Sequence, residues 1–203
     1  MKSNKLLALV VCIATGLLFY KIVYDGTVEV KSNIDGNYYK VRNGADKQLR
    51  ADILADIYLK YNVFINAIRN DQNYNNQENV QRLLYNWDGG VTVKEIGNLE
   101  NDAAYVINKK NMSFCLQKPS NKINLDELNL ITYVALHELS HIMSEEIGHG
   151  AEFVNNFEFV LNYAKTLSYF DPILQKQLPL YIPLSELNTS SSYCGVSLKN
   201  SMN

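Results

Sequence analysis

The stretch His137-Glu138-Leu139-Ser140-His141 lies inside a segment, Asn129 to Glu146, whose apolar residues recur with the spacing of a helix. It has the pattern H-E-x-x-H, which is typical of helices that bind a zinc ion. Because residues four positions apart lie on one face of a helix, His137 and His141 can both reach one metal ion. The chain contains 3 histidines, and the last of them, His149, follows soon after this segment. The pattern therefore predicts a zinc-binding helix over 129–146.

The sequence leaves three candidates for the third zinc ligand, one histidine and two carboxylates. A catalytic zinc site uses three protein ligands and leaves a fourth position for water. Gly148 lets the chain turn after the helix, and the turn would bring His149 back toward the metal, so His149 is the ligand that we expect. Glu152 and Glu158 remain alternatives, because some sites of this type take a glutamate from the following helix. Glu152 can also serve as a hydrogen-bond partner of a ligand.

Glu138 is the expected catalytic residue. It directly follows the first ligand, so it can take a proton from a water molecule acidified by zinc and pass that proton to the leaving amine. A zinc ion that only stabilises a fold needs no base beside its ligand. We therefore expect a zinc-dependent peptidase that hydrolyses peptide bonds of a protein or peptide substrate. The alternative is a non-catalytic structural or interaction protein that retains a zinc site.

The N-terminus carries an uncharged, mostly apolar run. Leu6 to Tyr24, interrupted by Lys21, has about the ~20 residues that a membrane-spanning helix needs. A cleaved signal peptide is the other interpretation, but 14–16 is a poor cleavage site inside the apolar run. We therefore expect residues 1–25 to form a single transmembrane anchor, residues 26–203 to form the peptidase domain, and the protein to be a single-pass membrane protein.

The charge pattern argues against nucleic acid as a partner. The formal net charge is -2, from 19 basic and 21 acidic residues, and these are interspersed without a lysine or arginine block. A nucleic-acid-binding protein usually carries a basic patch or stripe. We expect a protein or peptide substrate and the membrane as partners, and no nucleic acid.

The remaining patterns predict an α+β fold. Asp35-Gly36, between two alternating segments at 27–32 and 38–42, predicts a β-hairpin. The other expected elements, in chain order, are helices at 45–70 and 78–87, strands at 91–96, 104–108 and 112–117, the histidine-bearing helix, a helix at 151–170 and an irregular tail. We expect the strands to form a short antiparallel sheet packed on the H-E-x-x-H helix. The strand at 112–117 is the expected edge along which an extended peptide substrate binds.

The segment from Leu136 to Phe159 resembles the WLM and SprT-like zincins, a group of small zinc peptidases. These proteins place a third histidine shortly after H-E-x-x-H and a phenylalanine four residues later, as His149 and Phe153 are placed here. The chain departs from the group with Ser140 where alanine is usual and Val154 where tryptophan is common. The resemblance implies a zincin-like domain with three zinc ligands and one base, namely His137, His141, His149 and Glu138.

Residues 28 to 197 are similar to membrane-anchored metallopeptidases predicted for giant DNA viruses and some protists. The matching pieces are Val30 to Arg42, Tyr105 to Lys109, Phe114 to Leu116 and Tyr193 to Gly195. The similarity implies that the protein is located in a virion or a host membrane, whether it is a peptidase or the non-catalytic alternative. A SprT-like protease that acts on DNA-bound proteins is a third function, and the apolar N-terminal run and the lack of a basic face argue against it.

The pairing of Cys115 with Cys194 follows from this similarity and not from the residues alone. Two thiols in the predicted domain can form one disulfide in an oxidising compartment or remain unrelated and reduced. Both positions recur in the viral group, which implies a disulfide.

Overall fold

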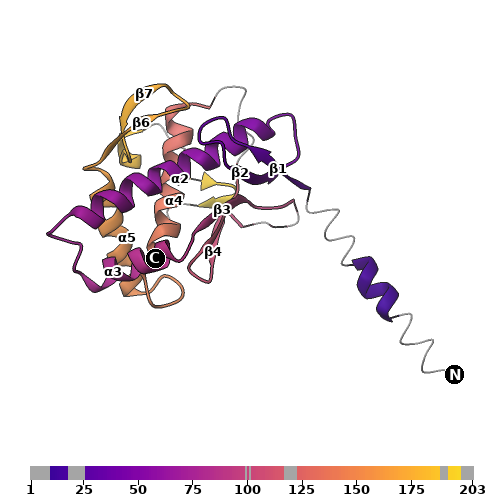
Figure 1. Cartoon of the computed structure of the whole chain (residues 1–203), viewed down its shortest axis with the longest axis horizontal. Helices are drawn as coiled ribbons and strands as arrows, with labels where there is room; N and C mark the ends of the chain where they lie inside the picture. The colour runs from indigo at the N-terminus through magenta and orange to yellow at the C-terminus, as the bar shows by residue number, and fades with distance from the viewer. Residues whose placement is uncertain are drawn as a thin grey trace.

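The computed structural model describes residues 10–17, 26–98, 100, 102–116, 123–187 and 192–197. It confirms a mixed α+β fold with short sheets (Figure 1). The helices are α2 (Lys47–Asn70), α3 (Glu78–Asp88), α4 (Leu125–Met143), α5 (Ala151–Ala164) and the 3-10 turn η1 (Leu184–Glu186). The strands are β1 (Thr27–Lys31), β2 (Tyr38–Arg42), β3 (Thr92–Glu95), β4 (Ala104–Ile107), β5 (Asn111–Phe114), β6 (Ser168–Asp171), β7 (Lys176–Pro179), β8 (Ser192–Tyr193) and β9 (Val196–Ser197).

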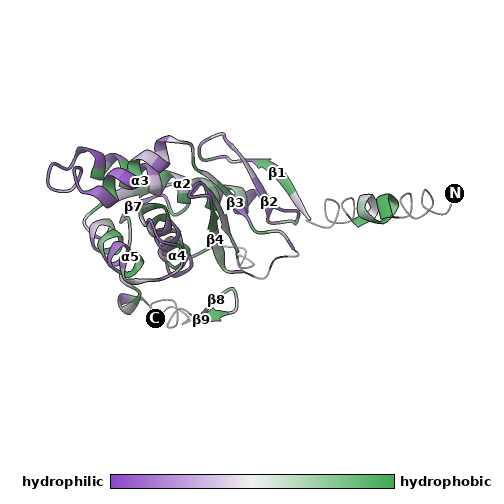
Figure 2. Ribbon diagram, turned by 90° about the horizontal axis from the view of Figure 1, so that it is seen from below, coloured by the Kyte–Doolittle hydropathy of each residue, from purple (hydrophilic) through white to green (hydrophobic). Residues whose placement is uncertain are grey.

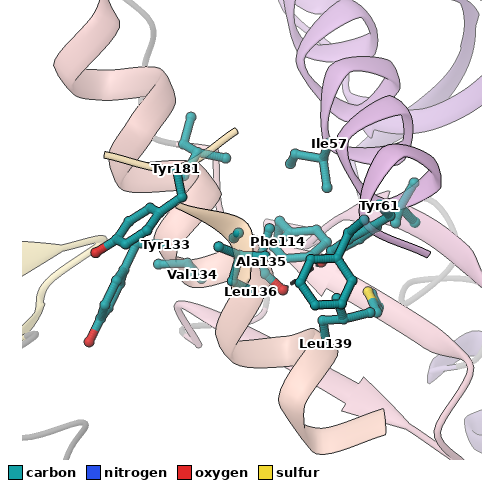
Figure 3. Packing of buried hydrophobic residues seen from close by; sticks show 14 of the residues in the cluster. Ile57, Tyr61, Phe114, Tyr133, Val134, Ala135, Leu136, Leu139 and Tyr181 are labelled. Carbon is teal, nitrogen blue, oxygen red and sulfur yellow. Dashed lines mark hydrogen bonds between the residues drawn. The ribbon is translucent and has the colours of Figure 1, made fainter. Parts of the chain in front are cut away.

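The predicted N-terminal hairpin and the first long helix are confirmed. β1 pairs with β2 in antiparallel register, and Gly36 in the turn has a φ of 74°, which is why a glycine stands there. α2 buries apolar residues at spacings of three and four, including Leu54, Ile57 and Tyr61. This stripe faces the core (Figure 3), while the opposite side of α2 is more hydrophilic (Figure 2).

The central sheet differs from the antiparallel sheet that we expected. Its strand order is β3-β5-β4, with β5 antiparallel to β4 and parallel to β3. The turn at 108–110, where Asn108 and Lys109 have positive φ angles, folds β4 back on one side of β5, and β3 occupies the other side. Because β5 is paired on both sides, the strand predicted at 112–117 cannot offer a free edge. The free edge beside the histidines belongs to β4. Position 117 lies outside the described residues.

α4 is the central helix of the fold. It starts with a capping box in which Asn124 Oδ1 accepts the backbone N–H of Glu127, and the Glu127 carboxylate accepts the N–H of Asn124. Most of its residues are buried, with Leu136 and Leu139 facing Tyr61 of α2 and Phe114 of β5 (Figure 3). The Tyr61 hydroxyl donates to the carbonyl of Ala135 at 2.7 Å, which satisfies the phenol inside the core.

The C-terminal part is more ordered than the sequence predicts. α5 ends at Ala164 rather than near residue 170, and the following residues form the antiparallel hairpin β6–β7. Tyr169 donates to the Asp171 carboxylate, which also accepts the N–H groups of Ile173 and Leu174 in the turn. Burial of this tyrosine and aspartate favours the hairpin over a longer helix, because an extended helix would leave the carboxylate without these donors.

The prediction of a transmembrane anchor is wrong. Among the residues that the structure describes, none of the helices combines the length and the apolar character needed to cross a membrane. In the predicted span, the structure describes a helix over residues 10–17. The other positions of that span lie outside the described residues. The expected localisation as a single-pass membrane protein is therefore wrong as well.

A disulfide joins the C-terminal segment to the central sheet. Cys115, directly after β5, is bonded to Cys194 in the turn between β8 and β9. Tyr193 is buried beside it and donates its hydroxyl to the Cys115 carbonyl. The pairing implied by the viral similarity is therefore present in the fold, and it closes a covalent loop across a sequence separation of 79.

Replacing Cys194 with serine should lower the free energy of unfolding by about 3–4 kcal/mol, because a covalent loop of this length restricts the unfolded chain. Urea denaturation of oxidised wild-type protein and Cys194→Ser measures the difference. The matched control is Cys12→Ser, because Cys12 is exposed and not disulfide-bonded. Equal stability of oxidised wild type and Cys194→Ser would contradict the prediction.

Candidate metal centre

The three histidines converge at the C-terminal end of α4. His137 and His141 come from successive turns of the helix, and His149 comes from the loop that leads into α5. The Nε2 atom of His149 lies 3.0 Å from that of His137 and 3.2 Å from that of His141. All three side chains offer a ligand atom within 4.8 Å of one another. Gly148, with a φ of 95°, makes the turn that brings His149 back.

The spacing of the nitrogens fits a zinc ion. Two imidazole nitrogens at about 2.0–2.1 Å from a tetrahedral zinc ion lie roughly 3.3 Å apart. The observed separations of 3.0 and 3.2 Å are close to that value. Three imidazoles with the same nitrogen aimed at one point form the donor set of a catalytic zinc site, which takes three protein ligands and keeps one position open.

Phe153 forms the floor under the three imidazoles. Its ring centroid lies 4.8 Å from that of His137, 4.3 Å from that of His141 and 4.7 Å from that of His149. Phe157 packs against His137 from the same helix face. The apolar surroundings restrict the orientations of the rings, so they hold the nitrogens in the converging arrangement.

The surroundings also keep the imidazoles of His137 and His141 neutral, which metal binding requires. Burial, together with the neighbouring histidines, lowers the pKa of His137 to about 3. Burial lowers the pKa of His141 to about 4, with smaller contributions from His149 and Lys109. The imidazoles of His137 and His141 are therefore neutral and able to act as ligands at neutral pH.

Glu138 lies beside the first histidine with its carboxyl group buried. The residue is 4% exposed and its Oε2 atom has no hydrogen-bond partner among the described residues. Burial raises the pKa of this carboxyl group to about 8. A buried carboxyl without a partner is costly and is typical of functional sites.

The two carboxylates that we kept as alternative ligands lie elsewhere. Glu152 accepts the backbone N–H groups of Glu145 and Glu146, each at 3.0 Å, and an N–H of Arg82 at 2.8 Å. These donors lower its pKa, the two backbone groups most strongly. Glu158 is exposed and lines a separate groove between α5 and the segment that carries Tyr181 and Pro183. The described geometry therefore brings His149, and neither carboxylate, to the other two histidines.

A cleft of about 390 Å³ opens between the histidines and β4. Its walls are β4 with the turn after it, the ligand face of α4, and the loop before α5. Lys109 in the turn donates to the carbonyl of His141 at 2.6 Å and to that of Glu146 at 3.3 Å. Neither Lys109 nor the β4 edge is predicted by the sequence, because no local pattern indicates that a hairpin turn will contact the end of a distant helix.

Comparisons with known proteins give distant viral homologues. The chain is 33% identical to uncharacterized protein 136R of Invertebrate iridescent virus 6 over 78 residues, which are 38% of this chain and 44% of the viral protein. It is 34% identical to uncharacterized protein 042R of Invertebrate iridescent virus 3 over 74 residues, 36% of this chain and 46% of that protein. It is 25% identical to uncharacterized protein R325 of Acanthamoeba polyphaga mimivirus over 150 residues, 71% of this chain and 74% of that protein.

The chain thus spans less than half the length of the two iridescent-virus relatives. No family model and no solved structure matches it. The similarities confirm the expected link to proteins of giant DNA viruses, whereas membership of the WLM and SprT-like zincins stays a prediction.

Proposed function

We propose that this protein is a zinc-dependent peptidase with His137, His141 and His149 as ligands and Glu138 as general base. The observation that carries the proposal is the convergence of the three Nε2 atoms, 3.0 and 3.2 Å apart, beside a buried and unpartnered carboxyl group. Both features face one cleft that is bordered by an open strand. A site that served only to stabilise the fold would require neither the carboxyl group nor the cleft.

The residues divide the chemistry between them. A zinc ion held by the three imidazoles supplies a Lewis acid that lowers the pKa of a water molecule to about 7, polarises a peptide carbonyl and favours the ionised form of a nearby carboxyl group. Glu138 then takes the proton of the attacking water and gives it to the leaving nitrogen. Phe153 and the apolar residues around it exclude bulk water from the back of the site.

The free edge of β4 fits an extended peptide. The N–H of Cys115 donates to the carbonyl of Ala103, so residues 103, 105 and 107 face β5 in the antiparallel ladder. Ala104 and Val106 therefore direct their N–H and C=O groups away from β5, and both residues line the cleft. Most of β4 is hydrophobic (Figure 2), and an exposed hydrophobic edge strand is a template for pairing with another chain.

For the proposed metal site, we expect the full chain to bind one zinc ion. His149→Ala should weaken this binding by more than about 100-fold, because the loss of a ligand costs more than the loss of a hydrogen-bond partner of a ligand. Competition with a chromophoric chelator measures the affinity. Glu158→Gln, in the separate groove beside α5, is the control and should bind zinc as the wild type does. A wild-type chain without zinc after purification in metal-replete, chelator-free buffer would refute the proposed site.

The second prediction separates catalysis from a structural use of zinc. Glu138→Gln should retain zinc and lose roughly 10²–10⁴-fold in the rate of peptide cleavage, the range expected for removal of a general base. A peptide-library digest with and without chelator identifies a cleaved substrate for the assay. Zinc binding without cleavage by the wild type would favour the non-catalytic alternative, and unchanged cleavage by Glu138→Gln would remove Glu138 from the mechanism.

The third prediction tests the strand edge. Val106→Pro removes an N–H that points away from the sheet, so the fold should tolerate it, while kcat/KM for a peptide should fall roughly threefold to tenfold with the loss of one hydrogen bond. Gln177→Pro is the matched control. The N–H of Leu180 donates to Leu167, so Gln177 also directs its N–H outward, but from β7 and not beside the cleft. Equal losses in both variants, or none in Val106→Pro, would argue against substrate pairing with β4.

A further inference from the structure

α3 places three polar side chains along one face that is turned toward the end of the histidine-bearing helix. Asn79, Arg82 and Asn86 are three and four positions apart, which aligns them on one side of α3. The apolar residues of the same helix, among them Leu83, are buried against the core. This polar row (Asn79, Arg82, Asn86) contacts the end of α4 and the residues that follow it, in the reverse order along the chain.

Two members of the row bind the last carbonyls of α4. Asn86 Nδ2 donates to the carbonyl of Ile142 at 3.0 Å, and Arg82 Nη1 donates to the carbonyl of Met143 at 3.0 Å. The last carbonyls of a helix have no partner within the helix, and a cation near them is stabilised by the helix dipole. The row therefore holds the end of α4 from which His141 projects.

The third member reaches the start of the histidine loop, residues 144–150. Asn79 Nδ2 donates to Asn156 Oδ1 at 2.8 Å, and Asn156 Nδ2 donates to the Ser144 hydroxyl at 2.9 Å. Ser144 and Asn156 are both buried. α3, α5 and the beginning of the loop are thus joined by side-chain amides.

Two glutamates fix the loop by an exchange of hydrogen bonds. The Glu152 carboxylate accepts the N–H groups of Glu145 and Glu146, and the Glu146 carboxylate accepts the N–H groups of Glu152 and Phe153 at 2.9 and 3.3 Å. The Glu146 carboxylate approaches Gly150 so closely that a Cβ at that position would lie 2.6 Å from both oxygens. A side chain at position 150 would displace the Glu146 carboxylate from this place, so the glycine leaves room for it, and the loop is held at both of its ends.

Arg82 is the cation that links the end of α4 to the hydrogen bonds that hold the loop. The same Nη1 atom that binds Met143 also donates to Glu152 Oε1 at 2.8 Å. Its contacts with Glu78 and Glu145 are longer, at 3.4 Å, and those carboxylates are 91% and 81% exposed, so they contribute little. Glu152 is 33% exposed and is bound by three donors in total, so it is the carboxylate through which Arg82 acts on the loop.

We propose that Arg82 is a positioning residue for the third ligand: by binding the Met143 carbonyl and the Glu152 carboxylate, it holds the loop so that His149 Nε2 stays 3.0–3.2 Å from the other two nitrogens. Because this proposal rests on the zinc site proposed above, its test measures zinc affinity in the full chain by chelator competition. Arg82→Gln should bind zinc about 10–100-fold more weakly than the wild type, the cost expected when a partner that orients a ligand is lost.

The matched control is Arg69→Gln. Arg69 also pairs with a carboxylate, in this case that of Asp88 through two nitrogens at 2.7 and 3.1 Å, but this pair links α2 to the end of α3 and not to the loop. Arg69→Gln should change zinc affinity by less than about twofold, as an exposed pair contributes little. Arg82→Lys should restore part of the affinity, because lysine keeps the charge but lacks the planar fork of donors.

A double-mutant cycle distinguishes positioning from general support of the fold. If Arg82 acts through His149, Arg82→Gln should cost less than about twofold in a His149→Ala background, although it costs 10–100-fold in the wild-type background. An equal loss in both backgrounds, or no loss in either, would overturn the role of Arg82. If Arg82→Gln does not fold, as judged by circular dichroism, Glu152→Gln replaces it in the same cycle, with the same two outcomes.

The cycle also separates this proposal from the proposed function. A wild-type chain that binds no zinc overturns both. A wild-type chain that binds zinc with its affinity unchanged by Arg82→Gln overturns the positioning role alone and leaves the three-histidine site in place.

Discussion

The burial of α4 is the constraint on which the rest of the structure depends. Most of its side chains are apolar and buried, and a helix that is apolar on nearly all sides must be covered on all of them. α2 and the central sheet cover one side, and α3 and α5 cover others (Figures 1 and 3). The cleft beside His137 and His141 lies toward the C-terminal end of the helix.

The same helix end explains the polar network around the histidines. Its last carbonyls require donors, and they receive them from three side chains on two elements: Lys109 of the β4–β5 turn binds His141, and Asn86 and Arg82 of α3 bind Ile142 and Met143. These contacts tie the β4–β5 turn and α3 to the helix that carries the ligands. The contacts at this helix end therefore help to position two of the elements that border the cleft, β4 and the loop before α5.

The sequence predicted those parts of the fold that depend on local patterns. The Asp35-Gly36 hairpin, the apolar stripe of α2 and the helix around His137 follow from residues close together in the chain, and all are confirmed. The sheet was predicted with the wrong topology, because strand order depends on which partners are available and not on alternation. The end of α5 was also wrong, since the periodicity continues beyond Ala164 while the buried hydrogen bonds of Asp171 favour a hairpin. The apolar N-terminal run matched a membrane helix in composition, but none of the described helices is long and apolar enough to cross a membrane.

The sequence by itself determined the residue types and spacing of the candidate site: two histidines on successive turns of one helix, a glutamate between them, and a third histidine after a glycine. Local geometry suffices for this, because helical periodicity places His137 and His141 on one face. Only the tertiary structure shows which of His149, Glu152 and Glu158 lies beside the other two histidines, because that depends on contacts from α3 and α5. It likewise shows that β4 borders the cleft. Interactions between segments far apart in the chain leave no local pattern, and they determine which of several available side chains faces the site.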